Sequence, residues 1–209
     1  MLRKTAIFLL LLVVCSVVGQ TTTASVTVYN EFRPATIHLT TGKLLRVSLA
    51  NIFLKNSSLL YVSGTQTKQA NIHTLTRVDF PDRVYYRLDT LLAYRIDSIG
   101  DDGLYCAQQI DIETWKQMVA NNTEFTSIDF GDMVGYSTAE LSDYHDLRFP
   151  VVNLYFYKID GKIIKVHERK LKQILNKEQR RKMETVIARK GFSWTDENWL
   201  KELFKTIEK

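Results

Sequence analysis

Apolar and polar side chains alternate with a period of two through residues 25–90. Successive side chains of a β-strand point to opposite faces, so this alternation predicts strands that each bury one face. Thr41-Gly42 is expected to form a turn, and Pro34 and Pro81 interrupt the pattern. We therefore expect residues 20–90 to be β-rich and antiparallel. The alternating runs are Val26 and Val28; Ala35, Ile37 and Leu39; Leu45, Val47 and Leu49; Ile72, Thr74, Thr76, Val78 and Phe80; and Val84, Tyr86 and Leu88.

Residues 91–175 instead read as strands that alternate with helices. Asp160-Gly161 suits a tight hairpin turn between two of these strands. This order predicts an α/β domain with a sheet and flanking helices. Strands are expected at 91–99, 125–130, 151–157 and 162–166, and helices at 111–121, from Ser137 or Thr138 onward, and at 168–175.

Residues 176–209 are expected to form a basic, amphipathic helical tail. Asn176 and Gln179 have the spacing of a capping box, and Gly191 is expected to stop that helix. Ser193 or Thr195 is expected to cap a last helix, whose apolar side carries Trp199, Leu200, Leu203, Phe204 and Ile207.

Residues 1–19 have the pattern of a signal peptide. Arg3 and Lys4 precede an apolar stretch, and Val17 and Gly19 are small residues at the positions that a signal peptidase prefers. Cleavage is therefore expected between Gly19 and Gln20. The apolar stretch is shorter than the roughly 20 residues that a transmembrane helix needs. We expect a protein that is secreted or resides in the lumen of the endoplasmic reticulum, with no transmembrane span.

Signal cleavage removes Cys15 and leaves Cys106 as the single cysteine of the mature chain. A lone cysteine in an oxidising compartment is buried and inert, paired with another molecule, or chemically active. Two sequons, at Asn56 and Asn121, predict N-glycosylation. Two cysteines in all exclude a zinc site built from cysteines, and neither a metal nor a cofactor is expected.

The formal net charge of +5 hides a strong segregation of charge. Residues 96–149 hold two basic and eleven acidic side chains, whereas residues 150–209 hold fifteen basic and eight acidic ones. Both regions can be solvated faces of one fold that attract each other. Alternatively, the basic segment 165–190 contacts an anionic surface, such as heparan chains or lipid headgroups. Aromatic and basic residues do not interleave, so nucleic acid is not expected as a partner.

The stretch from Leu141 through Phe149-Pro150-Val-Val, followed by Asp160-Gly161-Lys162, resembles the C-terminal half of thioredoxin-like domains. In that family a tyrosine and a branched apolar residue precede a cis-proline, and a hairpin and a helix follow. Tyr144 stands six residues before Pro150, while Leu147 lies one place later than the usual branched residue.

The upstream part of the resemblance centres on Cys106. Ile128-Asp129-Phe130 resembles the end of the family's Val-Asp strand, and Tyr105-Cys106 lies where its Trp-Cys-x-x-Cys motif would be. The resemblance, over residues 91–175, implies a thioredoxin-like sheet, with Cys106 at the start of a helix beside a cis-Pro150 that takes part in binding. Gln109 replaces the second cysteine of the motif. A dithiol oxidoreductase is therefore not expected, because the resolving thiol is missing.

Four parts are therefore expected: a signal peptide (1–19), a β-rich segment (20–90), the thioredoxin-like domain that the resemblance implies (91–175) and the helical tail (176–209). The function that this resemblance implies is a redox-inactive or monothiol module that binds another protein or acts as a chaperone. Cys106 is then the one candidate catalytic residue, through a mixed disulfide with a partner. Acidic neighbours disfavour its thiolate, so an inert thiol remains the alternative.

Three further hypotheses remain open. Asp101-Asp102-Gly103-Leu104-Tyr105-Cys106 resembles the F strand of an immunoglobulin domain, although tyrosine and cysteine are adjacent here and the partner cysteine is absent. The chain could accordingly be a secreted β-sandwich interaction protein with no redox chemistry. A cysteine hydrolase would use Cys106 with His145 or His167. His38 and His73, in alternating strands, are expected to be surface histidines. A carrier of an apolar ligand is the last hypothesis.

Overall fold

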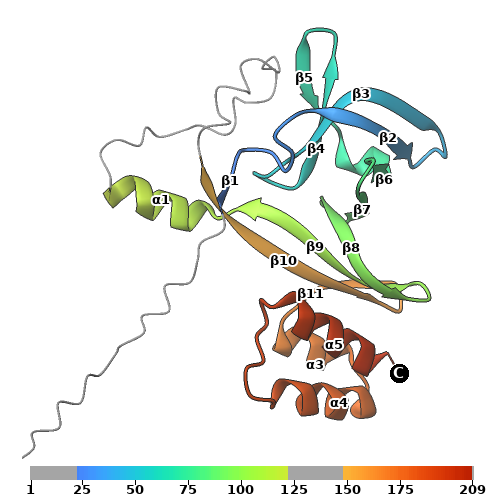
Figure 1. The fold of residues 1–209 in the computed structure, drawn as a ribbon. Helices are drawn as coiled ribbons and strands as arrows, with labels where there is room; N and C mark the ends of the chain where they lie inside the picture. The colour runs from blue at the N-terminus through green and yellow to red at the C-terminus, as the bar shows by residue number, and fades with distance from the viewer. Residues whose placement is uncertain (1–22, 122–147, 209) are drawn as a thin grey trace, which may run out of the picture.

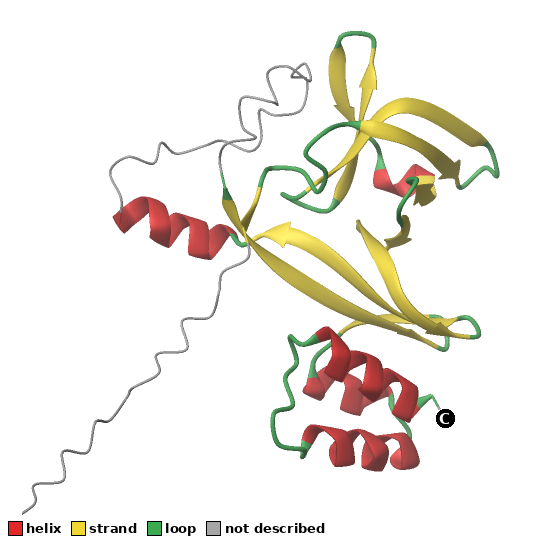
Figure 2. Cartoon of the chain, viewed as in Figure 1, coloured by secondary structure: helices red, strands yellow, loops and turns green. Residues whose placement is uncertain are grey.

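The computed structural model describes residues 23–121 and 148–208, and strands dominate this part of the chain (Figure 2). The strands are β1 (Thr23–Ala24), β2 (Arg33–Leu39), β3 (Leu44–Phe53), β4 (Ser58–Ser63), β5 (Gln66–Gln69), β6 (Leu75–Asp79), β7 (Val84–Leu88), β8 (Leu91–Ile99), β9 (Asp102–Ile110), β10 (Phe149–Ile159) and β11 (Lys162–Lys165). The helices are η1 (Ile72–Thr74, a 3-10 helix), α1 (Ile112–Asn121), α3 (Glu168–Ile174), α4 (Lys177–Ile187) and α5 (Glu197–Ile207).

The described strands form one sheet in the order β1-β10-β9-β8-β7-β6-β2-β3-β4-β5, and β11 also pairs with β10. All of their pairings are antiparallel. Strands β6 to β9 follow one another as hairpin neighbours, whereas β6 returns to pair with β2. The sheet therefore runs without interruption from the β-rich N-terminal region into β8, β9 and β10.

The sheet curls so that β4 comes back against the start of β8 (Figure 1). The backbone N–H of Leu92 donates to the carbonyl oxygen of Ser57, and that of Ile110 donates to the carbonyl oxygen of Leu54, both at 2.8 Å. A register shift between Arg33 and Ala35 marks a bulge in the β2–β3 pair, and bulges increase strand twist. The upper strands thus enclose a core, and β8, β9 and β10 leave it as a long ribbon.

Apolar side chains bury themselves in separate clusters on the two sides of this sheet. Inside the curl, Ile37, Ile52, Leu59, Val78 and Leu92 pack together. Between the ribbon and the C-terminal helices lies a second core, which contains Leu104, Cys106, Tyr157, Leu171, Leu175, Met183, Val186, Leu200, Leu203, Phe204 and Ile207.

The C-terminal helices dock on the ribbon through the aromatic side chain of Tyr157. Its ring stacks on Phe204 with 5.5 Å between the ring centroids, and its hydroxyl donates to the carbonyl oxygen of Leu200 at 2.7 Å. Burial raises the pKa of this phenol well above its usual range. Figure 1 shows α3, α4 and α5 together beneath the ribbon. Among the described residues, no helix is long and apolar enough to cross a membrane.

The expected thioredoxin-like α/β fold is wrong. Asp102–Ile110, where the resemblance implied a cysteine at the start of a helix, is the central strand β9, paired antiparallel with both β8 and β10. Side chains on both faces of β9 are covered: Leu104 and Cys106 on one, Tyr105 and Ala107 on the other. A strand buried on both faces carries no polar-apolar alternation, so the pattern that identified the other strands is absent here.

The expectation of a cis-Pro150 is wrong as well, because the described residues contain no cis peptide bond. Pro150 lies in β10 opposite Thr23 of β1, and its carbonyl oxygen accepts the N–H of Asp111 at 2.8 Å. It is an ordinary strand residue at the junction with α1. Tyr144, Leu147 and the 128–130 segment, which carried part of the resemblance, fall outside the described residues.

Several local expectations are confirmed. The strand over 91–99, the helix ending at Asn121 and the capping box of Asn176 and Gln179 are all present. The β10–β11 hairpin turns at Asp160 and Gly161, which both have positive φ. Two details differ from expectation: α4 ends at Ile187, before Gly191, and Asp196 rather than Ser193 or Thr195 caps α5.

Candidate functional site

Cys106 does not form a reactive site. It lies in the middle of β9 between Tyr94 and Tyr155 of the neighbouring strands, is free, and has no exposed surface. Burial raises the pKa of its thiol to about 11, because desolvation disfavours the thiolate. The structure thus supports the inert thiol among the three fates considered for this residue.

Of the two histidines considered as partners of Cys106, only His167 lies within the described residues, and it forms no catalytic pair with the buried thiol. His167 is exposed and caps α3, where its Nδ1 accepts the N–H of Arg169 at 3.2 Å. His145 lies outside the described residues. Surface positions were expected for His38 and His73. His73 is exposed in η1, as expected, whereas His38 is half-buried and its Nε2 lies 2.8 Å from Asp79 Oδ2.

The two sequons differ in what the structure shows. Asn56 is exposed in the turn between β3 and β4, as a glycosylated asparagine must be. Asn121 is the last residue of α1. Glycosylation at both positions stays a prediction.

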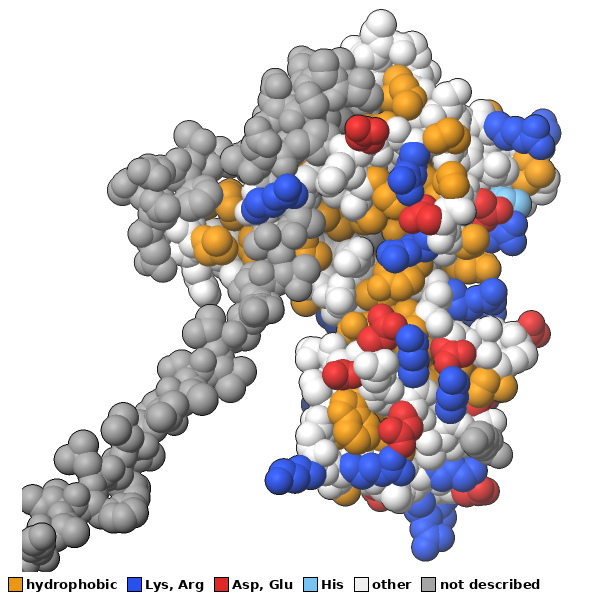
Figure 3. Space-filling view, viewed as in Figure 1, with side chains coloured by type: hydrophobic (Ala, Val, Ile, Leu, Met, Phe, Trp, Pro, Cys, Tyr) orange, Lys and Arg blue, Asp and Glu red, His pale blue; other side chains and the backbone are white. Residues whose placement is uncertain are grey.

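The basic segment 165–190 is partly neutralised by acidic side chains of its own helices. Lys172 pairs with Glu168 at 2.7 Å, Lys182 pairs with Glu178 at 2.8 Å, and Arg189 pairs with Glu202. Figure 3 shows lysine and arginine side chains over the helical end of the molecule, with acidic side chains between them. This mixture is typical of a solvated face.

A groove of about 450 Å³ lies where the strands meet the first turn of α5, and none of the candidate residues from the sequence line it. Its walls come from the segment before β7, from β7 and β8, and from Glu197 of α5. The lining residues are Asp82, Arg83, Val84, Tyr86, Tyr94, Arg95, Ile96 and Glu197.

Two arginine side chains of this groove stack on tyrosine rings. The guanidinium carbon of Arg83 lies 4.1 Å from the ring centroid of Tyr94, and that of Arg95 lies 5.1 Å from the centroid of Tyr86. Such cation–π contacts attract a guanidinium to the aromatic face. Each guanidinium also interacts with a second phenol, Arg83 with Tyr85 and Arg95 with Tyr105. We call these residues, Arg83, Tyr86, Tyr94 and Arg95, the arginine–tyrosine groove.

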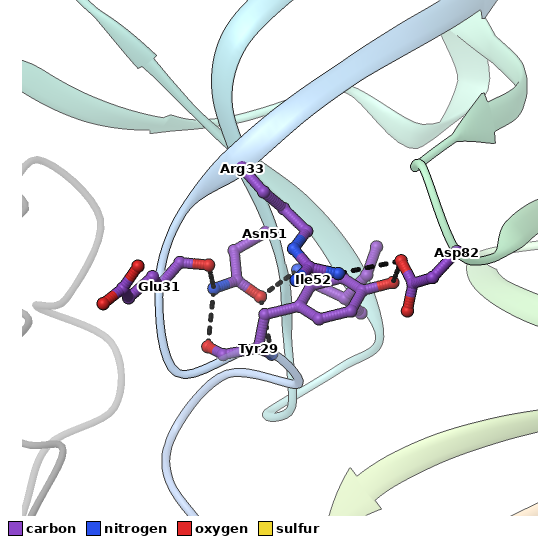
Figure 4. A network of polar contacts seen from close by, with 6 residues as sticks. All are labelled: Tyr29, Glu31, Arg33, Asn51, Ile52 and Asp82. Atoms are coloured by element: carbon purple, nitrogen blue, oxygen red, sulfur yellow. Dashed lines mark hydrogen bonds and ion pairs between the residues drawn. The ribbon is translucent and has the colours of Figure 1, made fainter.

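A third pair continues the arrangement beyond the groove (Figure 4). Arg33 lies 4.1 Å from the ring centroid of Tyr29, and both side chains bond to Asp82 Oδ1, Arg33 at 2.8 Å and the Tyr29 hydroxyl at 3.2 Å. Burial, with the nearby Tyr85 and Asp82, raises the pKa of the Tyr29 phenol well above its usual range, so it stays a neutral donor.

Asn51 positions this third pair. Its buried amide bonds both backbone groups of Tyr29: Oδ1 accepts the N–H at 3.1 Å and Nδ2 donates to the carbonyl oxygen at 2.8 Å. The amide thereby mimics a strand partner for the segment that enters β2. From Tyr29, edge and tilted ring contacts run through Phe80 and Tyr85 to Tyr94.

Two arginines and two carboxylates line the groove, and each carboxylate pairs with a basic side chain that is not part of the lining. Asp82 is already bound by Arg33, and Glu197 pairs with Lys201 at 2.6 Å. Among the described residues, neither Arg83 nor Arg95 forms an ion pair with a carboxylate. Nearby arginine and lysine side chains, such as Arg33 and Lys201, do form such pairs. The groove therefore presents two guanidinium groups that are available to an anionic ligand.

The side of β8 that borders the groove is a partly free strand edge. Residues 91–94 of β8 pair with β7, whereas Arg95, Asp97, Ser98 and Ile99 pair only with β9 among the described strands. In Figure 1, β7 ends near the upper part of β8, and no strand follows on that side. Backbone groups on this edge can accept another strand.

A second polar cluster lies on the outer face of β2 and β6. Asp79 accepts a hydrogen bond from Arg77 Nη2 at 2.8 Å and lies within 2.8 Å of His38. These three groups neutralise one another. Within residues 23–121 and 148–208, no cluster of histidine, cysteine and acidic side chains could hold a metal ion.

Sequence reasoning missed the arginine–tyrosine groove because its arginine–tyrosine contacts form only when the β7–β8 hairpin pairs, and because Glu197 comes from the distant α5. The one available signal was the concentration of tyrosines and arginines within residues 83–95. No family model, no curated protein and no solved structure matches the chain.

Proposed function

We propose that this chain is a secreted interaction protein without redox chemistry, which binds an acidic segment of a partner protein in the arginine–tyrosine groove. The observation that carries the proposal is the pair Arg83 and Arg95, stacked on tyrosines and without carboxylate partners beside a groove of about 450 Å³. Arginine and tyrosine dominate binding energy at protein interfaces, because they offer rigid contact area and directional donors.

The position of Cys106 supports an interaction role over a thiol-based one. A mixed disulfide requires an accessible thiolate, and this thiol is fully buried with a raised pKa. The groove also has the composition of a recognition surface: aromatic faces, aliphatic walls from Val84 and Ile96, and charge at the rim.

The mature protein, residues 20–209, can be titrated with the capped peptide acetyl-(Thr-Glu)₃-amide while binding is followed by isothermal titration calorimetry. We expect binding that weakens as salt is added, because the contacts are electrostatic. The double variant Arg83→Gln/Arg95→Gln should weaken it by about tenfold or more, since each charge-assisted contact is worth roughly 1.5–3 kcal/mol.

The matched control is Arg169→Gln/Arg181→Gln, which removes the same charge from exposed side chains of the helical part. It should change the affinity by less than about twofold, because such distant charges are screened. Equal losses in the two double variants would reject the groove as the site and would favour the basic segment 165–190 instead.

A further inference from the structure

We infer that the acidic segment binds as an added β-strand along residues 95–99 of β8. This inference rests on the proposed function and names its binding mode. Beyond Tyr94, β8 pairs with β9 alone, so the opposite side of these residues has no strand neighbour in the described part of the chain. An extended peptide can satisfy the backbone groups of such an edge while its side chains reach adjacent pockets.

The groove lies directly on this edge, because Arg95 and Ile96 belong to both. A strand added beside residues 95–99 would run past Arg95 and Arg83, whose guanidinium groups have no carboxylate partner of their own. Alternate side chains of a strand point to the same face. Arg95 lies on the face of the sheet that carries Tyr86, whereas Arg83 lies against Tyr94 on the face that carries Cys106. Acidic residues at every second position would therefore place successive carboxylates on the face of Arg95, and the intervening side chains would lie on the face of Arg83.

The remaining side chains of the edge fit an extended, mostly polar strand. Ile99 is 38% exposed and offers an apolar contact at the far end. Asp97 would repel an acidic ligand, but its carboxylate pairs with Lys205 at 3.0 Å and accepts the N–H of Ser98 at 2.9 Å. Local charge along the edge and the groove is thus positive because of Arg83 and Arg95.

The competing interpretation is that this edge is protected against strand addition. A register shift lies between Arg95 and Asp97, and bulges and charged side chains are common devices that blunt an exposed edge. The two interpretations differ in whether a bound peptide makes backbone hydrogen bonds to β8, which can be measured directly.

The experiment uses the mature protein and the peptide acetyl-(Thr-Glu)₃-amide together with two N-methylated versions, one methylated at every glutamate nitrogen and the other at every threonine nitrogen. Only one of these sets faces β8 in an added strand. Strand addition therefore predicts that the two methylated peptides differ in affinity by about tenfold or more. Only the peptide methylated on the side that faces β8 loses backbone hydrogen bonds, and the loss of two such bonds lowers the binding free energy enough to produce that difference. In NMR spectra, peptide backbone protons should show cross-peaks to the amide and α protons of residues 95–99.

Equal affinities of the two methylated peptides, without such cross-peaks, would overturn strand addition. The proposed function would survive that result if Arg83→Gln/Arg95→Gln still weakened binding of the unmodified peptide. Failure of the unmodified peptide to bind would reject the proposed function and the inference with it. Thermal unfolding of each variant verifies that lost binding is not lost folding.

Discussion

Cys106 and the two stacked arginines show how the position of a single residue determines its chemistry. The sequence could identify Cys106 as the cysteine that would remain after the expected signal cleavage, yet only the fold shows that it lies between two neighbouring strands and is fully buried. In contrast, Arg83 and Tyr94 are unremarkable in the sequence, and the β7–β8 hairpin brings them into contact. A pairing that depends on strand register leaves no local signature for sequence reasoning to find.

The buried thiol should resist alkylation in the native protein. With a pKa of about 11, its thiolate fraction at pH 7.5 is on the order of one in a few thousand, and no surface of the residue is exposed. We expect iodoacetamide to label the native mature chain far more slowly than the urea-unfolded chain, as followed by mass spectrometry. Cys106→Ser provides the blank, and labelling of the native protein at the unfolded rate would refute the inert assignment.

At the scale of elements, the expectations that succeeded have a local physical cause. The capping box at Asn176 and the Asp160-Gly161 turn each depend on a few adjacent residues, so the sequence alone predicts them. The central strand β9 failed for the opposite reason. Its sequence reflects burial on both faces, and that burial comes from the α3–α5 helices on one side and from aromatic side chains of other strands on the other.

Removal of the α4 cap should destabilise the helical part measurably. The side chain of Asn176 accepts the N–H of Gln179 at 2.9 Å, and the Gln179 side chain accepts the N–H of Asn176 at 3.1 Å. We expect Asn176→Ala to lower the free energy of unfolding by about 1 kcal/mol, because it leaves first-turn N–H groups without a partner. Urea unfolding measures this loss. The neighbouring exposed substitution Lys177→Ala should change it by less than about 0.5 kcal/mol.

At the scale of the whole molecule, the topology was the least predictable level. From residue 23 to residue 90 the chain is β-rich and antiparallel, as expected, but the same sheet continues through β8, β9 and β10, where an α/β domain was expected. Sheet order is set by pairings between residues far apart in the sequence, such as Ile37 with Val78 and Tyr155 with Cys106. The expected run of Val26 and Val28 is not a strand but contains an isolated bridge at Thr27, and Ile72–Thr74 is the 3-10 helix η1 rather than part of a strand. No short segment of the sequence encodes which strand pairs with which.

A cluster of three carboxyl groups links the ribbon to the end of α5 and should make stability depend on pH. Glu208 follows α5, and burial, together with the charges of Asp102 and Asp160, raises the pKa of its carboxyl above the ordinary 4.5. One of its oxygens is buried without a hydrogen-bond partner. The folded state therefore binds this proton more tightly than the unfolded state does. The stabilisation that comes from this raised pKa is fully present below pH 4.5, and it is lost as the pH rises through the pKa of Glu208 in the folded state.

The variant Glu208→Gln keeps the shape of the side chain and removes its charge. We expect it to match the parent protein at pH 4 and to exceed its stability at pH 7, as measured by urea unfolding at both values. The control Glu31→Gln makes the same substitution at an exposed side chain with no ion pair among the described residues, and should leave the difference between the two pH values unchanged. A Glu208→Gln protein that gained nothing at pH 7 would show that the charge of Glu208 is fully solvated there, and that the contact between α5 and the β9 end of the ribbon does not depend on its protonation.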